Sequence, residues 1–314
     1  MTHHELIEAV GANIEMFPAL DEKSMKEILQ GRNFSSGKEA IIFLNRHLRP
    51  KVSHQVVERH GLKVEQMERL LNRPFENDDS AVFLSSLDVQ PQALVLEIFS
   101  LYVDAIGGKG LTVTKDGKLP PKFYRDAANH LDSIPYCRQQ MNPELYSKSY
   151  DSAVHVTGVI AELAGLMDSD GGEYVLTDQF LRLMADQGQA GVYKHLFRVF
   201  VEDFSWSYSD RWQDIPLLQH SFLFTLYLLK KYGKEWRTTS FYLDNFLKTF
   251  PTILLEIKPV EHFFSPEDVL RYTYSVRCLD RFAHFFGLVE VERECWLKSR
   301  PLLDHVVQFS FESR

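Results

Sequence analysis

The sequence predicts a mainly α-helical protein with small β-hairpin wings, built from two winged-helix-like repeat units, a helical N-terminal region and a helical insert. Three observations predict it: apolar residues recur at helical spacing, two segments 122 residues apart align around a Gly-Leu pair, and strand-like runs follow that pair in both copies. We expect the N-terminal helical region in residues 1–80. The first unit, with a preceding helix and hairpin, is expected in residues 81–190, and the insert with the second unit in residues 191–314.

The N-terminal region is predicted as short helices. Residues 53–60, Gly61 and residues 64–71 have the pattern of a helix, a tight turn and a second helix. This pattern is typical of a helix-turn-helix and equally of any tight αα-hairpin, so both interpretations stay open. Residues 73–80 are polar, contain a proline and predict a linker.

A helix and a hairpin are expected before the first repeat copy. The helix begins at Pro91 and ends at Gly107-Gly108. Residues 111–119 then place β-branched residues before Asp116-Gly117, a pair that favours a tight hairpin turn. A further helix is predicted from Lys122 to about Leu131.

The repeat is centred on Gly165-Leu166 and Gly287-Leu288. Each copy predicts a capped helix, a second helix that ends at the glycine, two short strands and a closing helix, which is the arrangement of a winged helix. Two unrelated amphipathic stretches can also align by chance. Read without gaps, the alignment pairs Ile160 with Phe282, Leu163 with Phe285, Met167 with Val289, Tyr174 with Trp296, Val175 with Leu297, and Phe180 with Leu302.

Between the copies the sequence predicts only helices. One covers residues 192–204, a second covers residues 215–232 and ends at Gly233, and a third covers residues 241–257 with an interruption at Pro251.

Several strings in the chain resemble a family of uncharacterised bacterial proteins with winged-helix-like repeats. They are residues 34–40 with 43–45, 61–75, 111–123 and 287–290, and the string 111–123 departs from the family pattern at Lys118, where asparagine is more usual. The resemblance touches most of the chain. It implies the architecture above and carries no assigned activity.

Composition limits the classes of function. The chain has 314 residues, 43 acidic and 35 basic, so its formal net charge is −8, which disfavours binding of nucleic acid by the whole surface. The three cysteines predict free thiols in a reducing compartment. No secretory signal is expected, and the most apolar run, residues 222–229, is too short for a membrane span. We therefore expect a cytoplasmic protein without membrane contact.

Catalytic and metal-binding motifs are not found in the sequence. The glycines near Lys109 have the wrong order for a phosphate loop, no nucleophile elbow occurs, and the histidines and cysteines lack metal-ligand spacing. We therefore expect no enzymatic activity, no cofactor and no metal. The leading hypothesis is a non-catalytic protein-interaction or scaffold module, with its partner and oligomeric state left open.

The aromatic segment between two strong helices is the first candidate interaction surface. Residues 203–212 alternate aromatic side chains with hydroxyls and charges, and such residues are enriched in binding hot spots. Ordinary core packing of a loop is the alternative. The candidate residues are Trp206, Tyr208, Arg211 and Trp212.

A nucleic-acid-associated regulator is the alternative function. In the first copy the second helix, residues 155–164, has no lysine or arginine, and its wing, residues 168–173, is acidic and would repel phosphates. The second copy is more basic. Its candidate nucleic-acid contacts are Arg277, Arg281, Arg293, Lys298 and Arg300.

Overall fold

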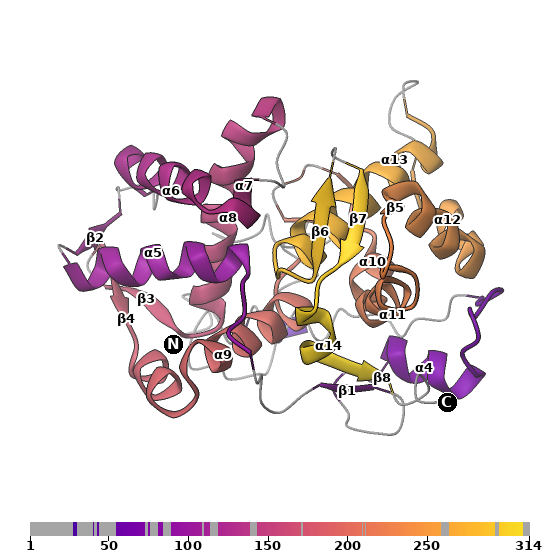
Figure 1. The fold of residues 1–314 in the computed structure, drawn as a ribbon, viewed down its shortest axis with the longest axis horizontal. Coiled ribbons are helices and arrows are strands. Elements are labelled where there is room, and N and C mark those ends of the chain that lie inside the picture. The colour runs from indigo at the N-terminus through magenta and orange to yellow at the C-terminus, as the bar shows by residue number, and fades with distance from the viewer. Residues whose placement is uncertain are drawn as a thin grey trace.

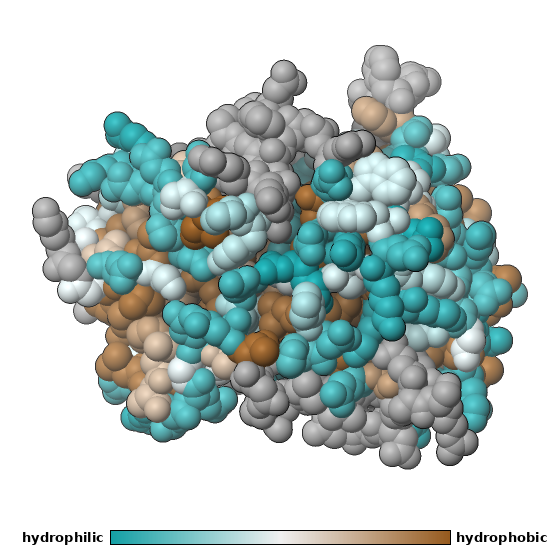
Figure 2. All heavy atoms as spheres, viewed as in Figure 1, coloured by the Kyte–Doolittle hydropathy of each residue, from teal (hydrophilic) through white to brown (hydrophobic). Residues whose placement is uncertain are grey.

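The computed structural model shows a mainly helical chain with small antiparallel sheets, which confirms the predicted fold class in its coarse form (Figure 1). The residues that the structure describes are 28–29, 40, 43, 55–72, 75, 81–83, 89–108, 110–113, 119–138, 143–170, 172–208, 210, 212–258, 264–292 and 295–309. Within them, no helix is long and apolar enough to cross a membrane. Figure 2 shows hydrophilic and hydrophobic residues interspersed on the face that it draws.

The first unit contains a three-stranded sheet of order β2-β4-β3. Helix α5 packs against α6 and α8, and the two hairpin strands follow α8 directly. Helix α9 leaves the sheet and has non-helical φ and ψ angles at Gly188, which divides it. The elements are α5 (Leu94–Gly108), β2 (Leu111–Thr112), α6 (Pro121–Ser133), α7 (Pro135–Arg138), α8 (Pro143–Leu163), β3 (Met167–Asp170), β4 (Glu173–Leu176) and α9 (Asp178–Glu202).

The second unit contains a three-stranded sheet of order β5-β7-β6. Helix α13 begins at the predicted Ser265-Pro266 cap, where Ser265 and Asp268 form a capping box, and it continues without a break into the π-helix η3. The elements are α10 (Pro216–His220), α11 (Phe222–Tyr232), β5 (Arg237–Thr238), α12 (Thr239–Thr249), η2 (Pro251–Leu255), α13 (Pro266–Tyr274), η3 (Ser275–His284), β6 (Val289–Glu292), β7 (Trp296–Ser299), α14 (Leu302–Val306) and β8 (Val307–Phe309).

The glycines at the centre of the predicted repeat have the same conformation. Gly165 has a φ of 65° and Gly287 a φ of 69°, in the left-handed region that favours glycine. The next residue closes the turn in both, because Leu166 N donates to Ala161 O at 2.9 Å and Leu288 N to Ala283 O at 2.8 Å. The prediction that glycine ends both helices before a strand is confirmed.

The strand pairings shift the predicted alignment by one residue after the turn of each hairpin. Met167 pairs with Leu176, whereas Val289, its counterpart, pairs with Ser299. The second hairpin has residues 293–295 between its strands and the first has residues 171–172. The gapless alignment therefore needs an insertion here, and Tyr174 corresponds to Leu297 rather than to Trp296.

Strand β5 corrects the prediction that only helices lie between the copies. Its two residues fall between α11 and α12 and pair with Leu297 and Trp296 of β7, so these helices belong to the second unit. Such a short polar strand has no alternation that a sequence could reveal. Strand β2 pairs with β4, and the Asp116-Gly117 turn of the predicted hairpin lies outside the described residues.

Most of the predicted N-terminal region lies outside the described residues. Helix α4 (Val64–Asn72) forms where a helix is predicted, but residues 55–59 are not helical, so no helix-turn-helix or αα-hairpin forms there. Instead Val57 N donates to Thr249 O at 3.0 Å and Glu58 N to Lys248 O at 3.2 Å, at the end of α12. Strand β1 (Ala81–Phe83), directly after this region, pairs with the C-terminal strand β8.

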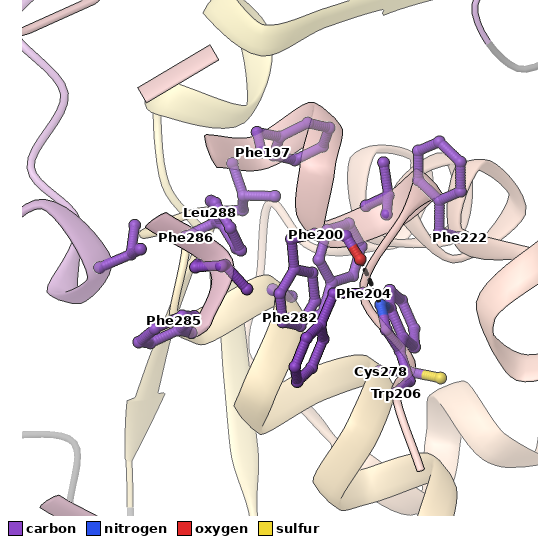
Figure 3. Close-up of a cluster of buried hydrophobic side chains, with 14 of the residues drawn as sticks. Phe197, Phe200, Phe204, Trp206, Phe222, Cys278, Phe282, Phe285, Phe286 and Leu288 are labelled. Atoms are coloured by element: carbon purple, nitrogen blue, oxygen red, sulfur yellow. Dashed lines mark hydrogen bonds between the residues drawn. The ribbon is translucent and has the colours of Figure 1, made fainter. Parts of the chain in front are cut away.

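An aromatic core joins α9 to η3 (Figure 3). Phe200 and Phe197 of α9 lie 5.1 and 5.3 Å from the ring centroid of Phe286, and Phe282 lies 4.9 Å from that of Trp206. Each ring is buried, and full burial of such a side chain stabilises a fold by about 1.5–3 kcal/mol. This core holds the connection between α9 and α10 against η3.

Candidate functional site

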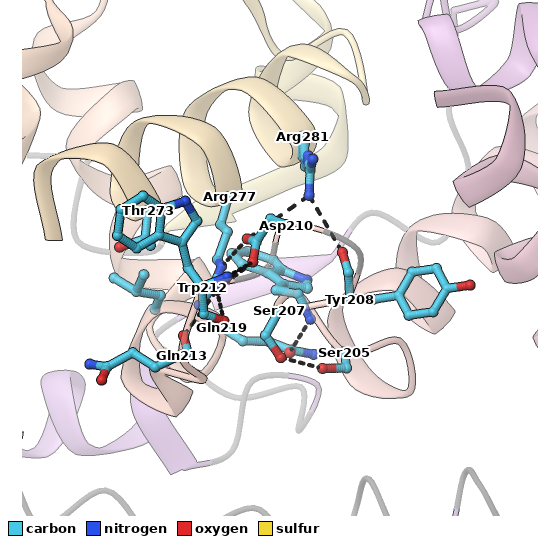
Figure 4. A network of polar contacts seen from close by, with 12 residues as sticks. Ser205, Ser207, Tyr208, Asp210, Trp212, Gln213, Gln219, Thr273, Arg277 and Arg281 are labelled. Carbon is cyan, nitrogen blue, oxygen red and sulfur yellow. Dashed lines mark hydrogen bonds and ion pairs between the residues drawn. The ribbon is translucent and has the colours of Figure 1, made fainter. Parts of the chain in front are cut away.

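The predicted aromatic segment crosses η3 between α9 and α10 (Figure 4). We call residues 203–208, 210 and 212–215 the crossing segment. Trp206 is buried, and its indole Nε1 donates to Phe200 O at 3.0 Å. Trp206 is therefore a core residue that anchors the crossing segment, as the core-packing alternative predicts, and it is not available to a partner.

A buried ion pair fixes the middle of the crossing segment. The side chain of Asp210 is 2% exposed and that of Arg277, on η3, is 1% exposed. Arg277 Nε donates to Asp210 Oδ2 at 2.6 Å and Nη2 donates to Oδ1 at 2.9 Å. The same Nη2 donates to Gln213 O at 3.0 Å and to Trp212 O at 3.3 Å. Both charges are thus paired and hydrogen-bonded, as burial requires.

Arg281 reaches the same carboxylate from one helical turn further along η3. Its Nη1 lies 3.9 Å from Asp210 Oδ2 and donates to Tyr208 O at 3.4 Å. The side chain of Arg277 is buried and cannot contact a phosphate. The prediction that Arg277 contacts nucleic acid is therefore wrong. Arg281 is partly exposed but is held by the crossing segment.

The side chain of Gln219 provides hydrogen-bond partners for backbone groups at the start of the crossing segment. Gln219 Nε2 donates to Phe204 O at 2.7 Å and to Val201 O at 3.1 Å, and Gln219 Oε1 accepts from Trp206 N at 3.2 Å. Buried backbone groups outside helices and sheets need such partners. One glutamine of α10 therefore fixes the start of the crossing segment.

Tyr208 extends the crossing segment to the first unit. Its hydroxyl lies 2.7 Å from His155 Nε2 on α8, and the two rings stack with centroids 5.7 Å apart. Helices α8 and η3 precede the hairpins of their units. The crossing segment therefore contacts the corresponding helix of both units.

Trp212 lies in a cluster of half-exposed rings. Its centroid is 5.2 Å from that of Tyr272 and 5.6 Å from that of Phe264. Tyr272 is 49% exposed and Phe264 is 48% exposed, and Trp212 is half-buried. Trp212 N donates to Asp210 Oδ1 at 3.0 Å, so the buried ion pair also positions this ring. We call Trp212, Phe264 and Tyr272 the aromatic surface.

Two of the predicted basic residues, Lys298 and Arg300, each contact another side chain of the protein. Arg300 donates to Gln92 O and to Gln92 Oε1, both at 3.1 Å, and so links the second unit to the residues before α5. Lys298 of β7 has its Nζ 6.0 Å from the ring centroid of Trp236, the residue before β5. Arg211 and Arg293 lie outside the described residues.

The sequence did not single out Phe264, Tyr272 or Asp210. Tyr272 lies on a helix whose cap is recognisable, but nothing local tells that it meets Trp212 sixty residues earlier in the chain. The sequence shows that Asp210 belongs to this segment, but it does not show that the side chain is buried. An aspartate flanked by aromatics with a distant arginine at helical spacing is too common a pattern to identify such a pair.

The two buried cysteines, Cys137 and Cys278, lack the surroundings of reactive thiols. No group of three histidine, cysteine or acidic side chains among them could hold a metal. Burial raises the pKa of the Cys137 thiol to about 12 and raises the pKa of Cys278 further, so both stay protonated and unreactive at neutral pH.

Comparison with known proteins adds no assignment for this site. No protein-family model, curated protein or solved structure matches the chain. The resemblance to uncharacterised bacterial proteins therefore stays an expectation. The function has to be inferred from the geometry of the aromatic surface and the crossing segment.

Proposed function

We propose that the protein is a non-catalytic interaction module that binds a protein partner through the aromatic surface. The observation that carries the proposal is the gathering of Trp212, Phe264 and Tyr272, with two of the rings about half exposed. Tryptophan and tyrosine are enriched in binding hot spots, and contiguous exposed apolar groups are typical of interaction sites.

The rigidity of the support strengthens this proposal. Trp212 is tied through its backbone to Asp210, and Asp210 is paired with Arg277 of η3. A ring held in place before binding loses less conformational entropy when a partner arrives. The buried Asp210–Arg277 pair therefore helps to preform the binding surface, because it holds the backbone of Trp212 in place before a partner binds.

We further infer that the two units are winged-helix-like repeats of a cytoplasmic protein. The support is the order helix, strand, helices, hairpin in both units, the matching strand orders β2-β4-β3 and β5-β7-β6, and the matching glycine turns. Winged-helix DNA binders place the helix before the hairpin in the major groove. Here the crossing segment contacts that helix in both units, which favours protein binding over the nucleic-acid alternative.

A comparison of three baits tests the proposal. Wild-type protein, the double variant Trp212→Ala/Tyr272→Ala and the control Val64→Ala would each be immobilised at equal density and incubated with lysate of the source cells. Val64 is an exposed apolar residue on α4, and Figure 1 shows α4 apart from α13, which carries Tyr272 of the aromatic surface. We expect a protein retained by wild type and control and lost from the double variant. Equal retention by all three would contradict the proposal.

A further inference from the structure

Exposed apolar side chains gather where β4 passes into the first half of α9. Val175 of β4 is 40% exposed, and Leu181 and Met184 of α9 are 56% and 36% exposed. Figure 1 shows α9 following β4 at the lower edge of the first unit. Single apolar residues are ordinary on a surface, whereas several that lie close together are typical of an interaction site.

The first half of α9 is fixed to the core by one side chain and leaves the next ones outside it. Phe180 is 6% exposed, and its ring centroid lies 5.6 Å from that of Phe99 on α5. Leu181 and Met184 are three residues apart, so they lie together on the helix surface and form an apolar face. This stretch of helix ends at Gly188, whose φ is 61°.

Charged side chains of both signs line one flank of this apolar face. Asp178, Arg182 and Asp186 follow one another at intervals of four residues, so they lie on the same side of the helix. All three side chains are exposed, and within the part of the chain that the structure describes none of them has an ion-pair partner. Their charges are therefore available to another molecule.

The spacing of these residues is self-complementary. Arg182 and Asp186 lie two residues before and two residues after Met184. In an antiparallel pair of α9 helices with both Met184 side chains at a two-fold axis, residue 182 of each copy lies opposite residue 186 of the other. The two-fold axis also brings the same flank of both helices together, so the pair of opposite charges forms twice. The apolar side chains of the two copies cover each other beside these pairs.

A second copy fits this surface better than a basic or an acidic partner does. A flank that carries both signs attracts neither class uniformly, because each segment of one sign meets a like charge as well as an opposite one. A second copy brings the matching charges in the matching order, together with an apolar face of the same size. We call Leu181, Arg182, Met184 and Asp186 the α9 face.

We propose that two copies of the chain associate through the α9 face, antiparallel about a two-fold axis at Met184, with Arg182 of each copy paired with Asp186 of the other. The α9 face lies on the first unit and shares no residue with the aromatic surface. Self-association and binding of a partner at the aromatic surface are therefore measured separately, and each can fail without the other.

Sedimentation velocity of the full chain tests the proposal. Wild type, Leu181→Ser/Met184→Ser and the control Leu255→Ser would be measured from about 1 to about 100 µM, where the weaker specific interfaces dissociate. Leu255 is 86% exposed and lies in η2 of the second unit. We expect wild type and the control to form dimers, and the double variant to associate at least about tenfold more weakly. A wild type that stays monomeric, or a double variant that dimerises as wild type does, overturns the proposal.

Charge reversal tests the antiparallel arrangement itself. Arg182→Asp and Asp186→Arg each place like charges in both pairs, so each variant alone should self-associate about tenfold more weakly at low ionic strength. In an equimolar mixture of the two variants, positions 182 and 186 carry opposite charges in both pairs, so a heterodimer should form as strongly as the wild-type dimer. Unchanged circular dichroism and melting temperature establish that the variants are folded. A mixture that associates no more strongly than either variant alone overturns the proposal.

Discussion

Replacing Asp210 with alanine should cost more stability than any exposed charge in the chain. The substitution leaves the guanidinium of Arg277 buried at 1% exposure without its carboxylate. Breaking a buried pair in this way costs about 3–5 kcal/mol, because an uncompensated charge stays in the interior. Trp212 N and Arg281 lose their contacts to the same carboxylate as well.

Urea unfolding followed by circular dichroism measures this loss, and two further variants separate its causes. Glu267→Gln removes the carboxylate of an exposed i,i+4 pair with Arg271 and should cost less than about 1 kcal/mol. The double variant Asp210→Ala/Arg277→Met removes both buried charges and should lose less stability than Asp210→Ala alone. A loss in Asp210→Ala as small as that in Glu267→Gln would refute the assignment of a buried, structural ion pair.

Three further predictions concern the core, pH and the glycine turns. Trp206→Ala should destabilise the fold by about 3–5 kcal/mol and Trp212→Ala by much less, measured by the same unfolding assay, because only Trp206 is buried in the aromatic core. Stability should fall below about pH 6.5, because burial lowers the pKa of His60 in the fold. Gly287→Ala should lower the melting temperature more than Gly172→Ala: both have positive φ, but a Cβ at Gly287 would lie 2.2 Å from Gln92 O, and one at Gly172 would meet nothing within 4 Å.

The sign of the pH effect follows from the contacts of His60. Its Nε2 donates to Asn245 O at 3.2 Å, so Nδ1 accepts from the Tyr232 hydroxyl at 3.2 Å and the neutral ring is fully satisfied. The unfolded chain binds a proton at higher pH than the fold does, so stability is complete above the unfolded pKa and is lost as pH falls through that value towards the folded pKa. Glu58 opposes this shift, whereas Lys231 adds to it. A His60→Gln variant with the same loss of stability between pH 7 and pH 5.5 as wild type would contradict this origin.

The sequence predicts local features of the fold well. Ser265-Pro266 begins α13, Gly233 follows the end of α11, and Gly165 and Gly287 adopt the left-handed turn, because each depends on a few adjacent residues. Strand β5 escaped prediction because its two polar residues become a strand only by pairing with β7. The pairing of β1 with β8 joins residues that are far apart in the sequence, such as Ala81 and Phe309, and has no local signal.

The candidate site shows the same division between local and distant information. Residues 203–212 were identified as unusual from their composition, yet Trp206 lies in the core and Trp212 in a half-exposed cluster. The difference comes from their neighbours, Phe282 of η3 for Trp206 and Tyr272 of α13 for Trp212, which are about 60 to 76 residues away in the sequence. The sequence predicts Arg277 as a surface residue, because the partner that accompanies its burial, Asp210, is 67 residues away.

Photo-cross-linking from the aromatic surface tests the central claim most directly. A photoreactive phenylalanine would replace Tyr272, or Val64 as the control, and lysate would be irradiated with each protein in the presence of excess unlabelled wild type or unlabelled Trp212→Ala/Tyr272→Ala. We expect one protein adduct from position 272 that wild type suppresses and the double variant does not, and no such adduct from position 64. No adduct from position 272, or one that both competitors suppress equally, would contradict the claim that the aromatic surface binds a partner.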